Sequence, residues 1–228
     1  MRIPSVVLLL LLIPLCIAMA MAQHPKPPTY CNPCVFYSGD FDVLNPKANA
    51  IWNGNNGTTQ GDIWVPFSVE NRITATGFFV NELFTTSQLG TNPTPYAVQK
   101  GIMKGQAGTV VCSGSDRATA TPTGRQGYGL VELTYQIKKL PKSCQLTKGT
   151  YWLNIEPQYA PSTEEIGYLG DVEDVSPRHH YGSKNVTDDS YFNAPQFDDN
   201  YVPTAGPEGA CGGIGCDMFS IGITGSGK

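Results

Sequence analysis

The chain has 228 residues, of which 15 are Lys or Arg and 19 are Asp or Glu, so its net charge is −4. This acidic balance argues against nucleic acid as a partner, because nucleic-acid-binding surfaces are basic. Gly (25), Pro (18) and Tyr (11) are frequent, and only 15% of the residues are charged. Such a composition is typical of short strands with many turns rather than of helices.

Residues 1–22 have the pattern of a secretory signal peptide. Arg2 gives a positive start, an apolar run follows, and an Ala-Met-Ala cleavage site precedes Gln23. We therefore predict a secreted or otherwise extracytoplasmic mature chain. Two alternatives stay open, an uncleaved membrane anchor and a lipid anchor on Cys16. Pro14 interrupts the apolar run, which is also shorter than the ~20 residues of a spanning helix, so we expect no membrane span after cleavage.

Six of the seven cysteines lie beyond this segment, and an even number in an exported chain predicts disulfides. They are Cys31, Cys34, Cys112, Cys144, Cys211 and Cys216. We expect Cys112 to pair with Cys144, because each belongs to or borders a strand of the same sandwich. The other four lie near the chain ends and either pair locally or tie the termini together. A redox pair at Cys31 and Cys34 is a weaker alternative, because a strand pattern follows the motif and no helix is there to lower the thiol pKa. A zinc site made by all four is another weaker alternative, because an oxidising compartment favours disulfides.

A Pro- and Cys-rich leader, residues 23–35, precedes a single β-sandwich domain at 36–228. Residues 45–61 cluster Asn, Gly and Thr and are predicted to form a loop. Pro66 indicates an edge strand or a bulge, and Gly77 indicates a bulge. The strands expected in the first half of the domain span residues 34–42, 62–70, 72–84, 96–103, 108–113 and 117–121.

The clearest strands lie between Gly124 and Pro157. Apolar and polar side chains alternate over residues 131–137 and again over 151–155, which predicts strands with one buried face and one wet face. Nowhere in the mature chain do apolar residues repeat with the 3.6-residue period of a helix over a useful length. The sequence therefore predicts an all-β fold, a β-sandwich of jelly-roll type.

Residues 158–217 differ from the rest of the chain. They are acidic and rich in Tyr, Pro and Gly, and their periodicity is weak. We predict a long irregular excursion before a final strand at 218–224. Loops of this length are commonly functional or disordered, and the aromatic residues argue against plain disorder.

Four phrases occur together in order: GTVVCSGSDRATATPTGRQGYG at 108–129, LTKGTYWLNIEP at 146–157, DSYFNAPQFDDNY at 189–201 and FSIGITG at 219–225. Their combination resembles a group of uncharacterised secreted bacterial β-sandwich proteins. The element L-x-x-G-x-Y-x-L at 146–153 also resembles the strand entry of many extracellular jelly-roll and carbohydrate-binding modules. The resemblance implies a fold and does not imply an activity.

Three tryptophans are candidates for ligand binding. Trp52 lies in a Gly- and Asn-rich stretch, and Trp64 and Trp152 are out of phase with their apolar neighbours, so they are predicted to face outward. An exposed indole stacks on a sugar ring or meets a protein surface. An extracellular glycan and a cell-surface protein are therefore the candidate partners. The alternative is that the indoles pack beneath the 158–217 excursion.

Asp40 and Asp42 are candidate Ca²⁺ ligands, because this ion binds carboxylate and carbonyl oxygens. The alternative is that both are outward residues or turn caps at the end of a strand. Ca²⁺ is the one cofactor that the sequence suggests.

Glu132 and Glu156 are the candidate carboxylate pair for a glycosidase-like hydrolase. Both are predicted on the polar faces of strands, where they would share a face if these strands pair. The alternative is that both are simply solvated. No recognisable nucleophile elbow, zinc-protease helix or phosphate loop is present. The sequence thus favours a secreted non-catalytic binding or surface-structural module and leaves a secreted hydrolase as the alternative.

Overall fold

The computed structural model describes residues 27–41, 47–54, 57–84, 93–157, 168–169, 181–182, 189–211 and 218–227. This part of the chain is built from β-strands, with one 3-10 turn, η1 (Pro195–Phe197), as its sole helical element. It contains no helix that is long and apolar enough to cross a membrane. The all-β prediction is confirmed.

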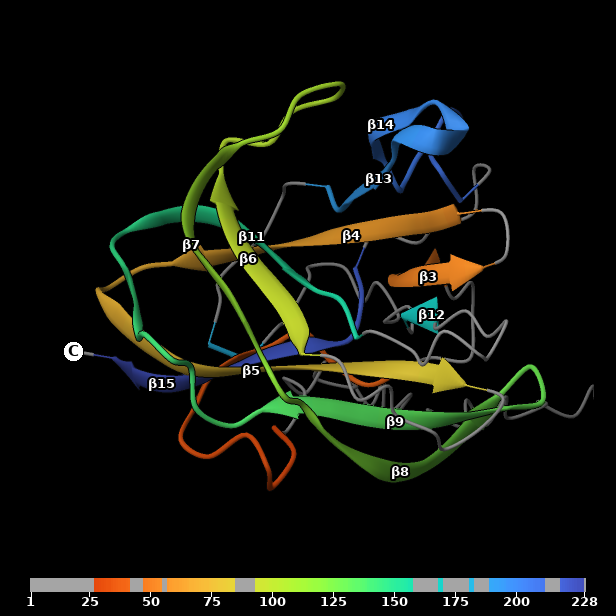
Figure 1. The fold of residues 1–228 in the computed structure, drawn as a ribbon. Coiled ribbons are helices and arrows are strands. Elements are labelled where there is room, and N and C mark those ends of the chain that lie inside the picture. Colours follow the sequence, from red (N-terminus) through yellow and green to blue (C-terminus); the bar gives the residue numbers. More distant parts are fainter. Residues whose placement is uncertain are drawn as a thin grey trace, which may run out of the picture.

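Two antiparallel sheets pack face to face (Figure 1). Sheet one contains β1 (Cys34–Tyr37), β2 (Lys47–Ala48), β5 (Ile73–Phe84), β8 (Thr119–Gly127), β9 (Leu130–Ile137), β10 (Cys144–Leu146), β12 (Tyr168–Leu169) and β15 (Ile221–Gly227). Sheet two contains β3 (Ala50–Gly54), β4 (Gly57–Val69), β6 (Thr94–Lys100), β7 (Thr109–Asp116), β11 (Gly149–Ile155), β13 (Tyr191–Ala194) and β14 (Asp199–Pro203). The long strands β5 and β4 organise the two sheets, because most other strands pair with one of them.

The main core lies between the two sheets and follows the period-two pattern. Leu133, Tyr135 and Ile137 of β9 are buried there, as are Phe78 and Val80 of β5. Each such side chain contributes roughly 1.5–3 kcal/mol when it is removed from water. Alternation of this kind is the reason why the sandwich could be predicted from the sequence.

The short corners at which the described chain crosses between the sheets include residues 70–72, 117–118 and 147–148. The disulfide between Cys112 of β7 and Cys144 of β10 joins the two sheets close to the corner at 147–148. This is the pairing expected from the sequence. A bridge that spans 32 positions of sequence stabilises the fold by about 3–4 kcal/mol in the chain-entropy description.

Asn49, which is fully buried, links the sheets at the opposite end of the sandwich. Its Oδ1 accepts a hydrogen bond from the backbone N–H of Ile63 in β4 at 2.9 Å, and its Nδ2 donates to the carbonyl of Ile155 in β11 at 2.8 Å. The amide thus replaces a missing ladder bond where β4 and β11 diverge. Its Nδ2 also donates to Glu82 of β5 at 2.8 Å, so one side chain connects both sheets.

Most strands match their predicted ranges, and the register between β5 and β15 shifts beside Gly77, which confirms the bulge. The loop prediction for residues 45–61 is wrong. This stretch holds β2, β3 and the start of β4, and Trp52 pairs with Thr59 across a hairpin. Gly54 and Gly57 allow the tight reversal, so the Gly- and Asn-rich composition marked the turn rather than a loop. Part of the 158–217 excursion is also regular, since β13 and β14 lie within it.

The outer faces of both sheets are covered. The segments on either side of β1, residues 27–33 and 38–41, cover part of the outer face of sheet one, where Tyr30 and Tyr37 of β1 pack on Phe79. The hairpin of β13 and β14 contributes Tyr191 and Tyr201 to a cluster on the outer face of sheet two. In Figure 1 this hairpin lies next to β4, and β13 is the strand that pairs with β4. Residues that alternation assigns to a wet face are therefore buried on both sheets.

Candidate functional site

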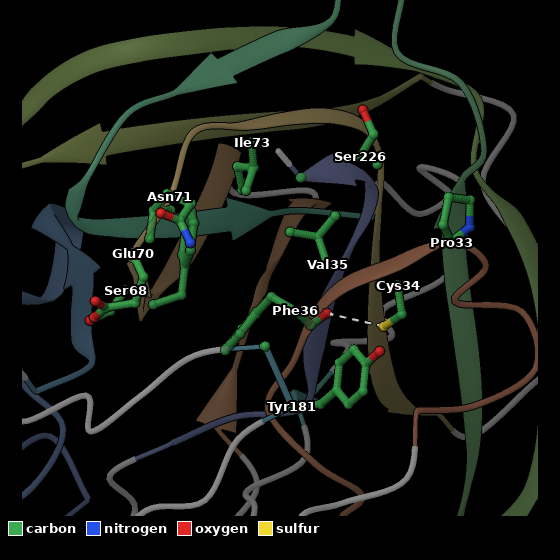
Figure 2. Close-up of a pocket in the computed structure, with 15 residues that line it drawn as sticks. Pro33, Cys34, Val35, Phe36, Ser68, Glu70, Asn71, Ile73, Tyr181 and Ser226 are labelled. Atoms are coloured by element: carbon green, nitrogen blue, oxygen red, sulfur yellow. Dashed lines mark hydrogen bonds between the residues drawn. The ribbon is translucent and has the colours of Figure 1, made fainter.

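A pocket of about 690 Å³ opens between β1 and β4 at one end of the sandwich (Figure 2). Its floor is apolar and is formed by Val35, Phe36, Phe67, Val69 and Ile73. Its rim is polar and includes Ser68, Glu70, Asn71, Tyr181 and Ser226. An apolar floor with a few polar groups at the rim is the usual construction of a small-molecule site.

The pocket exists because β15 extends beyond its partner β1 and carries no side chains on its inner face there. The pairing of β1 ends at Cys34, opposite Thr224. Residues 225–227 of β15 read Gly-Ser-Gly, and both glycines line the pocket. A Cβ on Gly225 would lie 2.2 Å from the backbone oxygen of Thr74, so the neighbouring strand occupies that position. A Cβ on Gly227 would meet Ile73 Cγ2 at 3.8 Å, an ordinary contact. This position is therefore open space that a larger side chain could fill.

Tyr181 and Gly182 form another part of the pocket wall. The backbone of Tyr181 exchanges two hydrogen bonds with Tyr37 of β1, at 3.1 and 3.0 Å. Gly182 has a φ of +75°, and a Cβ there would lie 1.8 Å from the carbonyl oxygen of Val35. A glycine is required at this position, and it brings the exposed ring of Tyr181 to the pocket.

Cys34 lines the pocket and is joined to Cys31 by a disulfide. The pairing of these two cysteines is thus local, and Cys31 is buried. Because both thiols are consumed, this pair supplies no zinc ligands. Cys211 is also disulfide-bonded, and its partner lies outside the described residues.

The structure places Trp64 and Trp152 on the outer face of sheet two, as their phase predicts. Both are only about 4–5% exposed, because Tyr201 covers Trp64 and Tyr191 covers Trp152, each with ring centroids 6.2 Å apart. Trp152 Nε1 also donates to the carbonyl of Asp189 at 2.9 Å. Neither indole offers a free face to a sugar, so the packing alternative describes both. The side chain of Trp52 lies outside the described residues.

Glu132 belongs to a charged cluster on the outer face of sheet one. Its Oε2 accepts hydrogen bonds from Arg125 Nε at 2.6 Å and from Thr123 Oγ1 at 2.5 Å. Arg125 Nη1 also lies 2.9 Å from Asp40 Oδ1, and the hydroxyl of Tyr37 donates to the same carboxylate. The side chain of Glu132 is fully buried, whereas that of Asp40 is 57% exposed. Burial raises the pKa of Glu132, and the contacts with Thr123 and Arg125 offset part of this effect.

The carboxylate pair expected from the sequence does not form. Glu132 lies on β9 in sheet one and Glu156 follows β11 in sheet two, and these strands do not pair. Both glutamates are buried rather than solvated. The carboxylate that shares Arg125 with Glu132 is instead Asp40.

Only one of the two predicted Ca²⁺ ligands lies among the described residues. Asp40 is engaged by Arg125 and Tyr37, and Asp42 lies outside the described residues. In the described part of the chain, no group of three or more His, Cys, Asp or Glu residues is arranged to hold a metal ion. The calcium site stays a prediction.

Sequence reasoning missed the pocket, because its lining comes from four distant segments. A usable signal was present at 225–227, where two glycines interrupt the apolar alternation of the last strand. Comparison of the chain with protein-family models, curated proteins and solved structures gave no match.

Proposed function

We propose that the protein is an exported, disulfide-stapled binding module whose ligand occupies the pocket between β1 and β4. The observation that carries the proposal is the pocket itself, about 690 Å³ in volume with an apolar floor and a polar rim. Small-molecule sites typically have volumes of about 300–1,000 Å³ and this distribution of polarity. The disulfides of the β-sandwich are compatible with an oxidising compartment, and the leader pattern at residues 1–22 supports export.

The lining favours binding over catalysis. Among the described residues that line the pocket, Glu70 is the one carboxylate, and Cys34 is oxidised. Acid–base chemistry of the glycosidase type uses two carboxyl groups that flank the substrate. Glu132 and Asp40 lie together, but their cluster lies on the outer face of sheet one and is engaged by Arg125.

The test is a ligand-observed NMR screen of a fragment library that includes mono- and oligosaccharides. Gly227→Phe places a phenyl ring in the pocket, at a position where a Cβ meets only an ordinary contact. Ser115→Phe adds the same ring to exposed β7 and is the control. We expect fragments that bind the wild type and Ser115→Phe to lose at least tenfold in affinity for Gly227→Phe.

Equal affinities of the same fragments for Gly227→Phe and the wild type would overturn the proposal, provided that both proteins unfold at the same temperature. If Gly227→Phe still binds oligosaccharides with the affinity of the wild type, any glycan site lies outside this pocket. A hydrolytic product in the oligosaccharide samples would instead favour the hydrolase alternative.

A further inference from the structure

We infer that the ligand is an amphipathic anion, with its apolar body in the pocket and its acidic head group on Arg72. This inference rests on the proposed function, and it adds a second hollow of about 170 Å³ that adjoins the pocket. The second hollow is lined by Arg72, Thr74, Gln145 and Ser226. Its lining consists of a guanidinium, an amide and two hydroxyls, so it suits a polar group and not an apolar one.

The sheet register explains why these side chains meet. Gln145 of β10 lies opposite Thr74 of β5, and Thr74 lies opposite Ser226 of β15. The three side chains therefore form a row across the outer face of sheet one. Arg72 lies two residues before Thr74, and its Nη2 donates to Gln145 Oε1 at 2.6 Å. This bond orients the guanidinium beside the row and leaves its other N–H groups available.

Ser226 lines both hollows, which places them on the two sides of a single strand. The Gly-Ser-Gly sequence at 225–227 keeps this wall thin, because the two glycines add no side chain on the pocket side. In Figure 2, the Ser226 hydroxyl is turned away from Val35 and Phe36. A ligand that fills the pocket can therefore extend past Ser226 into the outer hollow.

The charge of the head group follows from Arg72. This guanidinium is exposed and has no acidic partner among the residues that the structure describes. Glu70, the carboxylate of the pocket lining, lies on the side opposite Ser226 in Figure 2. A guanidinium binds carboxylate, phosphate and sulfonate groups through paired N–H donors. The outer hollow thus selects an acidic head group.

The test uses two fluorescent probes with the same type of apolar body. 8-Anilinonaphthalene-1-sulfonate carries an anionic head group, and N-phenyl-1-naphthylamine lacks it. Both are titrated into the wild type, Gly227→Phe, Arg72→Gln and Arg72→Lys. Arg117→Gln, which removes an exposed charge at the corner between β7 and β8, is the control for net charge. Thermal unfolding of each variant verifies that the fold is kept.

We expect Arg72→Gln to weaken binding of the sulfonate probe about tenfold, to leave the neutral probe within twofold, and to differ from Arg117→Gln. Arg72→Lys should keep most of the affinity, and Gly227→Phe should weaken both probes. Suppose that Arg72→Gln and Arg117→Gln bind the sulfonate probe with equal affinity, while Gly227→Phe binds both probes more weakly than the wild type. The inference about the head group is then wrong, and the pocket is still supported as the binding site. If Gly227→Phe binds both probes unchanged, or if the wild type binds neither, the pocket proposal itself fails.

Discussion

The covers over the two outer faces of the sandwich are held by different forces. On sheet one, the segments on either side of β1 make polar side-chain contacts. Tyr30 hydrogen-bonds Asn81 and Thr134, and Asp40 pairs with Arg125. On sheet two, β13 pairs with β4 through its backbone, and the side chains of the β13–β14 hairpin contact the sheet mainly through rings, with Tyr201 on Trp64 and Tyr191 on Trp152.

Both covers leave buried polar atoms without a hydrogen-bond partner among the described residues. These atoms are Arg125 Nη2 and Glu132 Oε1 on sheet one, and Asp62 Oδ1, Asn193 Oδ1 and Trp64 Nε1 on sheet two. The difference lies in the main side-chain contacts, which are an ion-paired cluster on sheet one and aromatic rings on sheet two. Apolar contact is non-directional and can hold a cover while it leaves polar atoms unpaired, at a cost of about 1–3 kcal/mol each. The cover of sheet one should therefore respond to pH, and that of sheet two to loss of apolar area.

The largest effect is expected from Trp152→Ala, which removes a buried indole from beneath Tyr191. It should lower the free energy of unfolding by about 3–5 kcal/mol. Trp152→Phe is the control, because it keeps a ring under Tyr191 while it loses the bond to the Asp189 carbonyl, worth about 1 kcal/mol, and part of the indole's packing. Urea unfolding followed by circular dichroism measures both values. A loss below about 1 kcal/mol for Trp152→Ala would show that the rings do not hold this cover.

A smaller effect, with a defined sign, is expected at Glu132. Burial raises its pKa in the folded state above the ordinary value of 4.5. The folded protein therefore binds this proton more tightly than the unfolded chain, and the resulting stability is present at acid pH and lost as pH rises through the folded pKa. Each pKa unit of difference corresponds to about 1.4 kcal/mol. The stability of the wild type relative to Glu132→Gln should thus increase as pH falls from 7 to 4.

Urea unfolding of both proteins across this pH range measures the difference. Glu208→Gln is the control, because Glu208 has an 86% exposed side chain and its substitution should leave the pH profile of the wild type unchanged. A difference between the wild type and Glu132→Gln that shrinks toward pH 4 would reverse the sign and show that the contacts with Arg125 and Thr123 outweigh burial.

The strands could be predicted because alternation records which residues share a face. Leu133 and Tyr135 lie in the core as expected. Alternation does not record what covers the second face, however, so Glu132 and Thr134 were assigned to solvent and are buried. The same limit applies to Trp152, whose outward direction was predicted and whose cover was one of two alternatives.

The pocket could not be predicted, because it depends on tertiary proximity and on missing side chains. Val35, Phe67 and Ile73 read as ordinary strand residues and meet only when β1, β4 and β5 are placed in space. The space between them is left by Gly227, whose role depends on β15 extending beyond β1. The resemblance to secreted bacterial β-sandwich proteins implies the β-sandwich fold and does not imply a pocket of this kind.

The smallest effect should come from the ion pair that joins the cover of sheet two to the β6–β7 turn. Lys104 Nζ lies 3.2 Å from Glu208 Oε2, with the two side chains 63% and 86% exposed. Exposed pairs contribute little, so Lys104→Ala should change the free energy of unfolding by less than about 0.5 kcal/mol. Urea midpoints at low salt and in about 0.5 M NaCl, where exposed charges are strongly screened, measure this change. A loss above about 1 kcal/mol that disappears in salt would mean that charge, as well as aromatic contact, holds the hairpin of β13 and β14 in place.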